Sequence, residues 1–236
     1  MLRRVDRLLA EAEAVDCSPR LLELARDFEE VVNTREFPCV FSTQPFTTRE
    51  IYFDIVRGAD AVESRAVTLL RELCDIIRDV PDAIGVIFVD DAGAQSIDDE
   101  FKLATRIVQA VMNANALKHP DAVLPKPHES SWTLWLEDTG LFLNFSSPLH
   151  TARRSRNVGS TLTIIAQARD SFDRQGRASP KVRSEIRRRV AAYDDVAPHP
   201  CLGSYTDPDS REALQFFLGN GLEPYDPTGG CLDESA

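Results

Sequence analysis

The stretch SSPLHTARRSR, residues 146–156, brings one histidine and three arginines together. His150 directly follows an apolar, strand-like run at 141–147, and the end of a strand is a rigid place from which to direct a ligand. Arg153, Arg154 and Arg156 could each bind a carboxylate through forked, charge-assisted hydrogen bonds. The plainer interpretation is a solvated, positively charged turn that contains an incidental histidine.

The four histidines of the chain, His119, His128, His150 and His199, have no spacing that specifies a metal site. The sequence also has no HExxH motif, no GxGxxG or P-loop motif, and no Gly-x-Ser-x-Gly turn of a serine hydrolase. A heme iron, however, needs only one protein ligand, so isolated histidines are compatible with heme. His150 is the strongest candidate, and His199 remains the alternative. His119 and His128 lie in a proline-rich loop and suit ordinary surface roles.

Cysteine could provide a different iron ligand, because a thiolate can hold heme and promote oxygen activation. Cys39 lies in the apolar stretch EFPCVFS, where a neutral buried thiol is the commoner outcome, so it ranks below His150. The five cysteines are scattered and form no CxxC pair, which argues against a disulfide framework or a structural zinc site: Cys17, Cys39, Cys74, Cys201 and Cys231.

The order of the expected helices and strands, which must position these residues, predicts an α+β fold. Its central antiparallel sheet, of hairpin or meander type, would be flanked by helices. Apolar periodicity predicts helices at 19–32 and about 60–80, and further helices that begin after Ser96, at Pro180 and at Asp207. Alternation and short apolar runs predict strands at 49–56, 85–91 and 161–167, and a hairpin within 131–146. In the helix that begins at Pro180, Arg183 and Arg187 are expected to face solvent.

Composition limits the classes of partner. The net charge of −11 argues against broad nucleic-acid binding and against adhesion to anionic membranes. No stretch reaches transmembrane length, and the start, MLRRVDRLLAEAEAVD, is expected to form an amphipathic helix rather than a signal peptide. We therefore expect a cytoplasmic protein with one domain over 1–236 and a lobe boundary at 118–130.

Several motifs occur in the order found in a known family. FPCVF, KPHESSWTLWLEDTGLFLNFSSPLHTARRSR, ARDSFD, IRRRVAAYD and HPCLGSYTDPDSREALQFFLGNG resemble the YqcI/YcgG family over about residues 37–221. That family includes heme-dependent N-oxygenases of the guanitoxin and D-cycloserine pathways, which hydroxylate guanidine nitrogens. The resemblance consists of several modest motifs and has no single decisive signature.

The resemblance implies roles for particular residues. PLHTARRSR implies that His150 is the axial ligand of heme b and that the three arginines after it contact a propionate or the substrate. FPC places Cys39 near the pocket. REALQFF implies that Glu212 and Gln215 are catalytic-site residues, and Glu212 is the first choice to bind a guanidinium group. Asp207 and Asp209 are weaker choices, since acidic residues at a helix start also favour the helix dipole.

Two departures from the family pattern are visible. Many guanidine-hydroxylating members carry a histidine before the SFD segment, where this chain has Arg169. The usual C-terminal Cys-Pro-Phe is also missing, because Cys231 is followed by Leu232. Another substrate or a changed site would account for both departures.

The resemblance thus implies a heme-dependent N-oxygenase that hydroxylates a guanidine or amine nitrogen of a small amino-acid-like substrate. Its partners would be oxygen or peroxide and an electron-donor protein. A heme-binding or sensor protein without turnover would use the same histidine. A third interpretation is an interaction module without a cofactor, in which all four histidines are structural.

Overall fold

The computed structural model describes residues 1–5, 18–58, 61–90, 93–177, 179–203, 207 and 209–229. Its centre is a six-stranded sheet with the order β1-β2-β3-β6-β5-β4. The strands are β1 (Arg3–Arg4), β2 (Ile51–Arg57), β3 (Ile84–Asp90), β4 (Leu134–Leu136), β5 (Thr139–Ser146) and β6 (Leu162–Ala168). The main helices are α2 (Pro19–Val32), α3 (Gln44–Thr48), α4 (Val62–Asp79), α5 (Ile97–Lys118), α6 (Ser171–Arg174) and α7 (Pro180–Tyr193). This arrangement confirms the α+β class.

The sheet is mixed rather than wholly antiparallel. β2 and β3 pair in parallel, with Ile51 opposite Ile84, whereas β3, β6, β5 and β4 pair in antiparallel fashion. Parallel pairing requires a crossover that returns the chain to the same end of the sheet, and α4 provides it between β2 and β3. The hairpin predicted within 131–146 is confirmed as β4 and β5.

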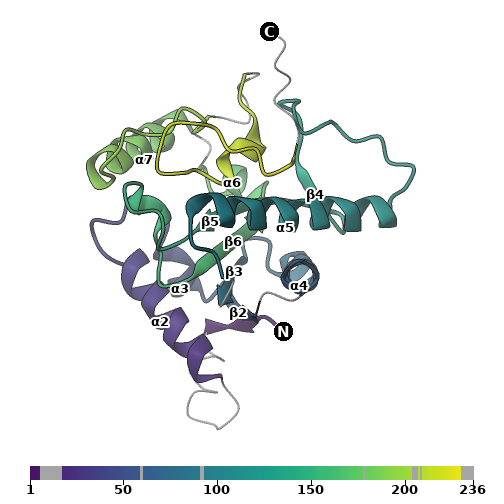
Figure 1. Ribbon diagram of the computed structural model, residues 1–236, viewed down its shortest axis with the longest axis horizontal. Coiled ribbons are helices and arrows are strands. Elements are labelled where there is room, and N and C mark those ends of the chain that lie inside the picture. Colours follow the sequence, from purple (N-terminus) through teal and green to yellow (C-terminus); the bar gives the residue numbers. More distant parts are fainter. Residues whose placement is uncertain are drawn as a thin grey trace.

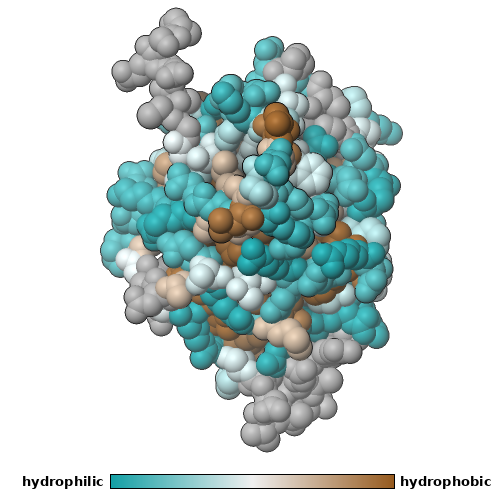
Figure 2. Space-filling view, turned by 90° about the vertical axis from the view of Figure 1, so that its right-hand side faces the viewer, coloured by the Kyte–Doolittle hydropathy of each residue, from teal (hydrophilic) through white to brown (hydrophobic). Residues whose placement is uncertain are grey.

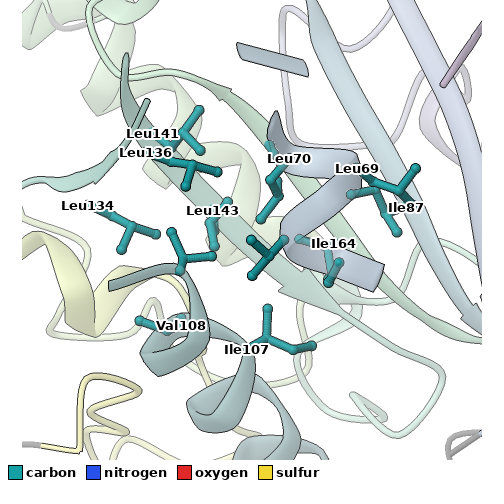
Figure 3. Close-up of a cluster of buried hydrophobic side chains, with 14 of the residues drawn as sticks. Leu69, Leu70, Ile87, Ile107, Val108, Leu134, Leu136, Leu141, Leu143 and Ile164 are labelled. Atoms are coloured by element: carbon teal, nitrogen blue, oxygen red, sulfur yellow. The ribbon is translucent and has the colours of Figure 1, made fainter. Parts of the chain in front are cut away.

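One face of the sheet is packed against α4 and α5. Every second residue of β5 and β6 points to this side, so Leu141, Leu143 and Ile164 meet side chains of the two helices. Figure 3 shows these residues together with Leu69 and Leu70 of α4 and Ile107 and Val108 of α5. Ser96 begins α5 as expected, because its side chain accepts a hydrogen bond from the backbone N–H of Asp99 at 3.2 Å.

The opposite face is covered in two different ways. Over β2 and β3, the buried side of α2 packs against the sheet, with Phe28 against Phe53 and Phe88. Over β5 and β6, residues of α7 and of the neighbouring loops face the sheet across a cavity. In Figure 1, α2 and α7 lie to the left of the strands and α4 lies to the right.

The C-terminal part differs from the helix expected to begin at Asp207. The structure has a short 3-10 helix, η2 (Glu212–Gln215), and no regular secondary structure in residues 216–221 after it. The Phe216 carbonyl accepts a hydrogen bond from the backbone N–H of Phe145 at 2.9 Å, so the chain here completes the edge of β5 beyond the short β4. If the helix continued beyond residue 216, the Phe216 carbonyl would accept a hydrogen bond within the helix, and the bond from Phe145 would be lost.

The first residues also differ from expectation, because Arg3 and Arg4 form the edge strand β1 against β2. The rest of the amphipathic helix expected there lies outside the described residues, as do Cys17 and Cys231. The segment 118–130 connects α5 to β4, and strands from both sides of it belong to the same sheet.

The molecular surface agrees with the acidic, polar composition. The face seen in Figure 2 is largely hydrophilic, with hydrophobic groups scattered between polar ones. Within the described part of the chain, no helix combines the length and the apolarity that crossing a bilayer requires.

Candidate functional site

The cavity between the sheet and α7 has a volume of about 360 Å³, within the range of small-molecule and cofactor sites. Its walls are mainly apolar and include five phenylalanines: Phe28, Phe37, Phe41, Phe142 and Phe172. β5 and β6 supply the floor, because Phe142, Asn144 and Gln167 lie on the side of the sheet away from α4 and α5. Arginines, a cysteine and a glutamate interrupt the apolar lining.

Glu212, at the start of η2, lines the cavity and is only 4% exposed. Its Oε2 accepts a hydrogen bond from Nε of Arg169 at 3.0 Å, whereas its Oε1 is buried and has no hydrogen-bond partner among the described residues. Burial raises the pKa of Glu212 to about 7, and the Arg169 charge opposes this rise. Arg169, the position of the first departure noted in the sequence, thus holds one of the two carboxylate oxygens.

Gln215 also lines the cavity, and its backbone carbonyl accepts a hydrogen bond from Arg156 at 2.9 Å. Asp207 and Asp209, the weaker acidic candidates, are not part of the cavity wall. The structure therefore brings Glu212 and Gln215 to the cavity and leaves the two aspartates outside it.

The three arginines after His150 have separate positions. Arg153 is buried and donates to the backbone carbonyls of Gly219, Ala197 and Gly221 at 2.8, 3.3 and 2.8 Å. Its guanidinium also lies 3.7 Å from the carboxylate of Asp194. Most of its hydrogen-bonding capacity is therefore used to hold the C-terminal segment.

Arg156 has a similar position on the cavity wall. It donates to the carbonyls of Gln215 and Phe216, and burial lowers its pKa to about 9. Arg154 is half exposed and stacks on Tyr193 with its guanidinium 4.7 Å from the ring centre. Arg153 and Arg156 line the cavity, and Arg154 does not.

His150 is fully buried but is not part of the cavity wall. Its ring packs against Phe217, its Nδ1 lies 3.3 Å from the Ser147 hydroxyl, and its Nε2 has no hydrogen-bond partner. Burial, with a smaller contribution from the Arg156 charge, lowers the pKa of His150 to about 4. The imidazole is therefore neutral at physiological pH.

The other histidines also lie away from the cavity. His199 is buried, donates from Nε2 to the Glu223 carbonyl at 3.1 Å and accepts at Nδ1 from the backbone N–H of Cys201. These two bonds satisfy both ring nitrogens. His119 lies 3.4 Å from Asp138 at the surface, and His128 is exposed. In the described ranges, no cluster of three or more His, Cys, Asp or Glu could hold a metal ion.

Cys39 lies on the cavity wall, directly after Phe37 and Pro38, which also line it. Burial raises the pKa of its thiol, while the charges of Arg177 and Arg189 lower it by less. The thiol is therefore neutral, as its apolar sequence context predicted. It is the cavity residue best suited by donor type to hold a soft or borderline metal such as heme iron.

The sequence interpretation missed several residues of the site. Arg187 of α7 is exposed as expected and Arg183 is half-buried, but both also line the cavity beside Ile186 and Val190, a role that the sequence did not indicate. The spacing of these four residues places them on one side of the helix, and this could have indicated a shared surface. Arg177 and Gln167 also line the cavity, and no motif pointed to either.

Comparison with known proteins connects this site to named relatives. The chain is 32% identical over 180 residues to the "Putative N(omega)-hydroxy-L-arginine synthase DcsA" of Streptomyces lavendulae, covering 72% of this chain and 68% of the relative. It is 28% identical over 194 residues to the uncharacterized protein YcgG of Bacillus subtilis strain 168, covering 77% and 76% of the two chains. The uncharacterized protein YqcI of the same strain is 27% identical over 125 residues, covering 52% of this chain and 49% of YqcI.

No solved structure matches the chain significantly. The model of one protein family matches residues 28–227, a range that contains the walls of the cavity, Glu212 and Cys39. On this match, the chain belongs to the YqcI/YcgG family.

Proposed function

We propose that this protein is an N-oxygenase that hydroxylates a guanidine nitrogen of arginine, or of a similar small amine, with heme as its cofactor. The name of the relative DcsA supports the reaction and the substrate class. The observation that carries the proposal is Glu212, a buried carboxylate on the cavity wall with one oxygen that has no partner.

Glu212 matches the cationic end of such a substrate. A guanidinium group donates hydrogen bonds in a fixed fork and binds carboxylates strongly where water is excluded. Arg169 already holds Oε2, so the substrate would donate to Oε1. The phenylalanines on the walls would exclude water around this contact and strengthen it.

The residues present fit a heme in the same cavity. Apolar, aromatic walls suit the porphyrin, and arginines on the wall suit its two propionates. When bound, heme supplies the oxidising chemistry, while the protein supplies position and electrostatics. In the net reaction, one oxygen atom enters an N–H bond. With O₂ as the oxidant, the other atom leaves as water after a donor delivers two electrons and two protons.

Cys39 and His150 are the two candidate iron ligands, and their positions favour Cys39. Its thiol lies on the cavity wall, whereas His150 would need a rearrangement to reach the cavity from its site beside Phe217. A thiol that binds a metal loses its proton, so the raised pKa of Cys39 would fall on coordination. This order reverses the ranking drawn from sequence alone.

The ligand is tested on the purified protein loaded with heme. The proposal expects a thiolate-type ferrous–CO band that Cys39→Ser abolishes and that His150→Ala leaves in place. A histidine-type band that survives in Cys39→Ser and disappears in His150→Ala would instead assign the iron to His150.

The function is tested by titrating heme-loaded protein with L-arginine, then adding either hydrogen peroxide or O₂ with a chemical reductant, and following N-hydroxyarginine by mass spectrometry. Glu212→Gln should bind heme normally but weaken arginine binding by about tenfold or more, because a charge-assisted hydrogen bond is worth roughly 1.5–3 kcal/mol. Glu63→Gln is the matched control, since Glu63 also pairs with an arginine, Arg106, at 2.6 Å but lies on α4, outside the cavity. Wild-type protein that takes up no heme, or Glu212→Gln with unchanged arginine affinity, would contradict the proposal.

A further inference from the structure

Arg177 is a buried cation on the cavity wall to which the proposed function assigns no specific contact. It follows α6 after Gly176, whose φ of 66° turns the chain, and it is 8% exposed. Its guanidinium stacks over the ring of Phe41 at 4.7 Å. Its Nη1 donates to Oε1 of Gln167 at 3.1 Å, and Nε is buried without a hydrogen-bond partner.

Three other arginines of the cavity wall have partners that Arg177 lacks. Arg169 pairs with Glu212, and Arg153 lies beside Asp194. Arg156, like Arg177, makes no ion pair with any residue that the structure describes, but it donates to two backbone carbonyls, those of Gln215 and Phe216. Arg177 forms no ion pair within the described residues, and the nearby carboxylate of Asp82 is held by Arg174.

A buried charge without a counter-charge is costly, and so is a buried donor without an acceptor. Both costs fall on Arg177, and both would be removed by one ligand group: an anion with two oxygens placed against the guanidinium. A carboxylate has this shape.

We propose that Arg177, oriented by Gln167 and Phe41, forms a subsite that binds a carboxylate of the molecule in the cavity. The identity of that molecule rests on the proposed function. The carboxylate would be either the α-carboxylate of an arginine-like substrate or a propionate of heme.

The position of the subsite favours an amino acid. Gln167, which contacts Arg177, and Arg169, which contacts Glu212, are two residues apart at the end of β6. Residues spaced in this way lie on the same side of a strand, about 7 Å apart. A positive subsite and a negative subsite would therefore be held side by side, which suits a molecule with a carboxylate at one end and a guanidinium at the other.

The experiment compares Arg177→Gln with wild type and with the control Arg174→Gln. Arg174 lies three residues earlier, pairs with Asp82 near the surface and is not part of the cavity wall. Arg177→Lys, which keeps the charge and loses the fork, is the conservative variant. Circular dichroism and thermal melts establish that each variant is folded.

Two pairs of probes distinguish the sources of the carboxylate. L-arginine is compared with agmatine, which lacks the carboxylate, and heme is compared with its dimethyl ester, which lacks free propionates. If the substrate is the source, Arg177→Gln weakens arginine binding by about tenfold or more and leaves agmatine unchanged. If heme is the source, Arg177→Gln weakens heme binding and leaves the dimethyl ester unchanged.

A third pair of probes does not depend on the proposed function. Butyrate should raise the melting temperature of the heme-free wild-type protein more than butyramide does, and Arg177→Gln should abolish the difference. Equal effects of Arg177→Gln on both members of every pair, or no effect on any of them, would overturn the subsite. If butyrate protects wild type while neither heme nor arginine binds, the subsite stands and the proposed function fails.

Discussion

The two faces of β5 use neighbouring residues for opposite purposes. Leu141, Leu143 and Phe145 are fully buried against α4 and α5, where apolar side chains fill the space between helix and sheet. Phe142, Asn144 and Ser146 point the other way and line the cavity. A single strand thus provides packing on one side and a floor for a ligand on the other, and its alternation keeps the two apart.

Two buried glutamates show the same contrast. Burial raises the pKa of both Glu100 and Glu212 to about 7. Glu100, on α5, accepts a hydrogen bond from the Ser147 hydroxyl and forms no ion pair in the part of the chain that the structure describes. Glu212, at the cavity, has Arg169 on one oxygen and no partner on the other. Similar burial therefore produces a carboxyl that is hydrogen-bonded to a hydroxyl in one place and a carboxyl that is paired with a cation in the other.

The largest expected effect tests whether the two faces of β5 differ in packing. Leu143→Ala should cost about 2–5 kcal/mol of unfolding free energy, because it leaves a cavity in a close-packed region. Asn144→Ala should cost less, on the order of 1 kcal/mol, because it removes the hydrogen bond from the Ser146 hydroxyl to its Oδ1 at 2.8 Å but leaves no new void in a close-packed region. Urea unfolding of the two variants measures both values. Equal losses would mean that the two faces are packed alike.

The second prediction concerns Glu100. Its folded-state pKa of about 7 exceeds the ordinary value of 4.5, so its contribution to stability is present at low pH and is lost as pH rises through about 7. Glu100→Gln removes this ionisation and should be more stable than wild type by on the order of 3 kcal/mol near pH 8. Near pH 4 the difference should be small. Glu212→Gln should gain less, since it leaves Arg169 without a charge partner. Thermal melts between about pH 4 and pH 8 measure this change. A difference in melting temperature between Glu100→Gln and wild type that stays constant with pH would contradict the raised pKa of Glu100.

The third prediction uses the pKa of Glu212. Below about 7 its carboxylate is increasingly protonated and binds a guanidinium less well. Arginine affinity should therefore fall by about tenfold for each pH unit below the pKa of the free site. Calorimetric titrations at several pH values measure this slope. Glu212→Gln should bind weakly with little dependence on pH, and a slope that remains in this variant would point to another group.

The smallest expected effect is a difference in the rate at which two thiols are modified. Cys39 lies on the cavity wall, whereas Cys74 is fully buried on the packed face, where burial raises its pKa to about 12. A maleimide reagent should modify Cys39 slowly and Cys74 only after unfolding. Heme in the cavity should protect Cys39. Peptide mass spectrometry separates the sites, and modification of Cys74 at the rate of Cys39 would contradict the difference between the faces.

Local signals explain what the sequence predicted correctly. The alternation of Leu141, Leu143 and Phe145, the Ser96 cap and the start of α7 at Pro180 all depend on residues a few positions apart. The features that were missed depend on distant partners. The parallel pairing of β2 with β3 and the contact of Phe216 with Phe145 are examples that no local pattern contains.

The candidate site shows the same limit. Glu212 and Gln215 were found only through the family resemblance, because nothing in REALQFF alone indicates a cavity. Arg177 was missed, since a buried arginine without a charge partner is recognisable only from its surroundings. The ligand role of His150 and that of Cys39 stay predictions, although the cavity wall includes the cysteine and not the histidine.

The closure of the β5 edge by residue 216 has a consequence for biosynthesis. The chain emerges from the ribosome in order, so α4, α5 and the strands up to β6 can assemble while later residues are still inside. The cavity cannot close at that stage, because Glu212 and Gln215 form part of its wall and Arg153 needs the carbonyls of Gly219 and Gly221. A nascent chain would thus have a folded core before it has a closed pocket, and any ligand of the cavity would bind only after the last of these residues has been released.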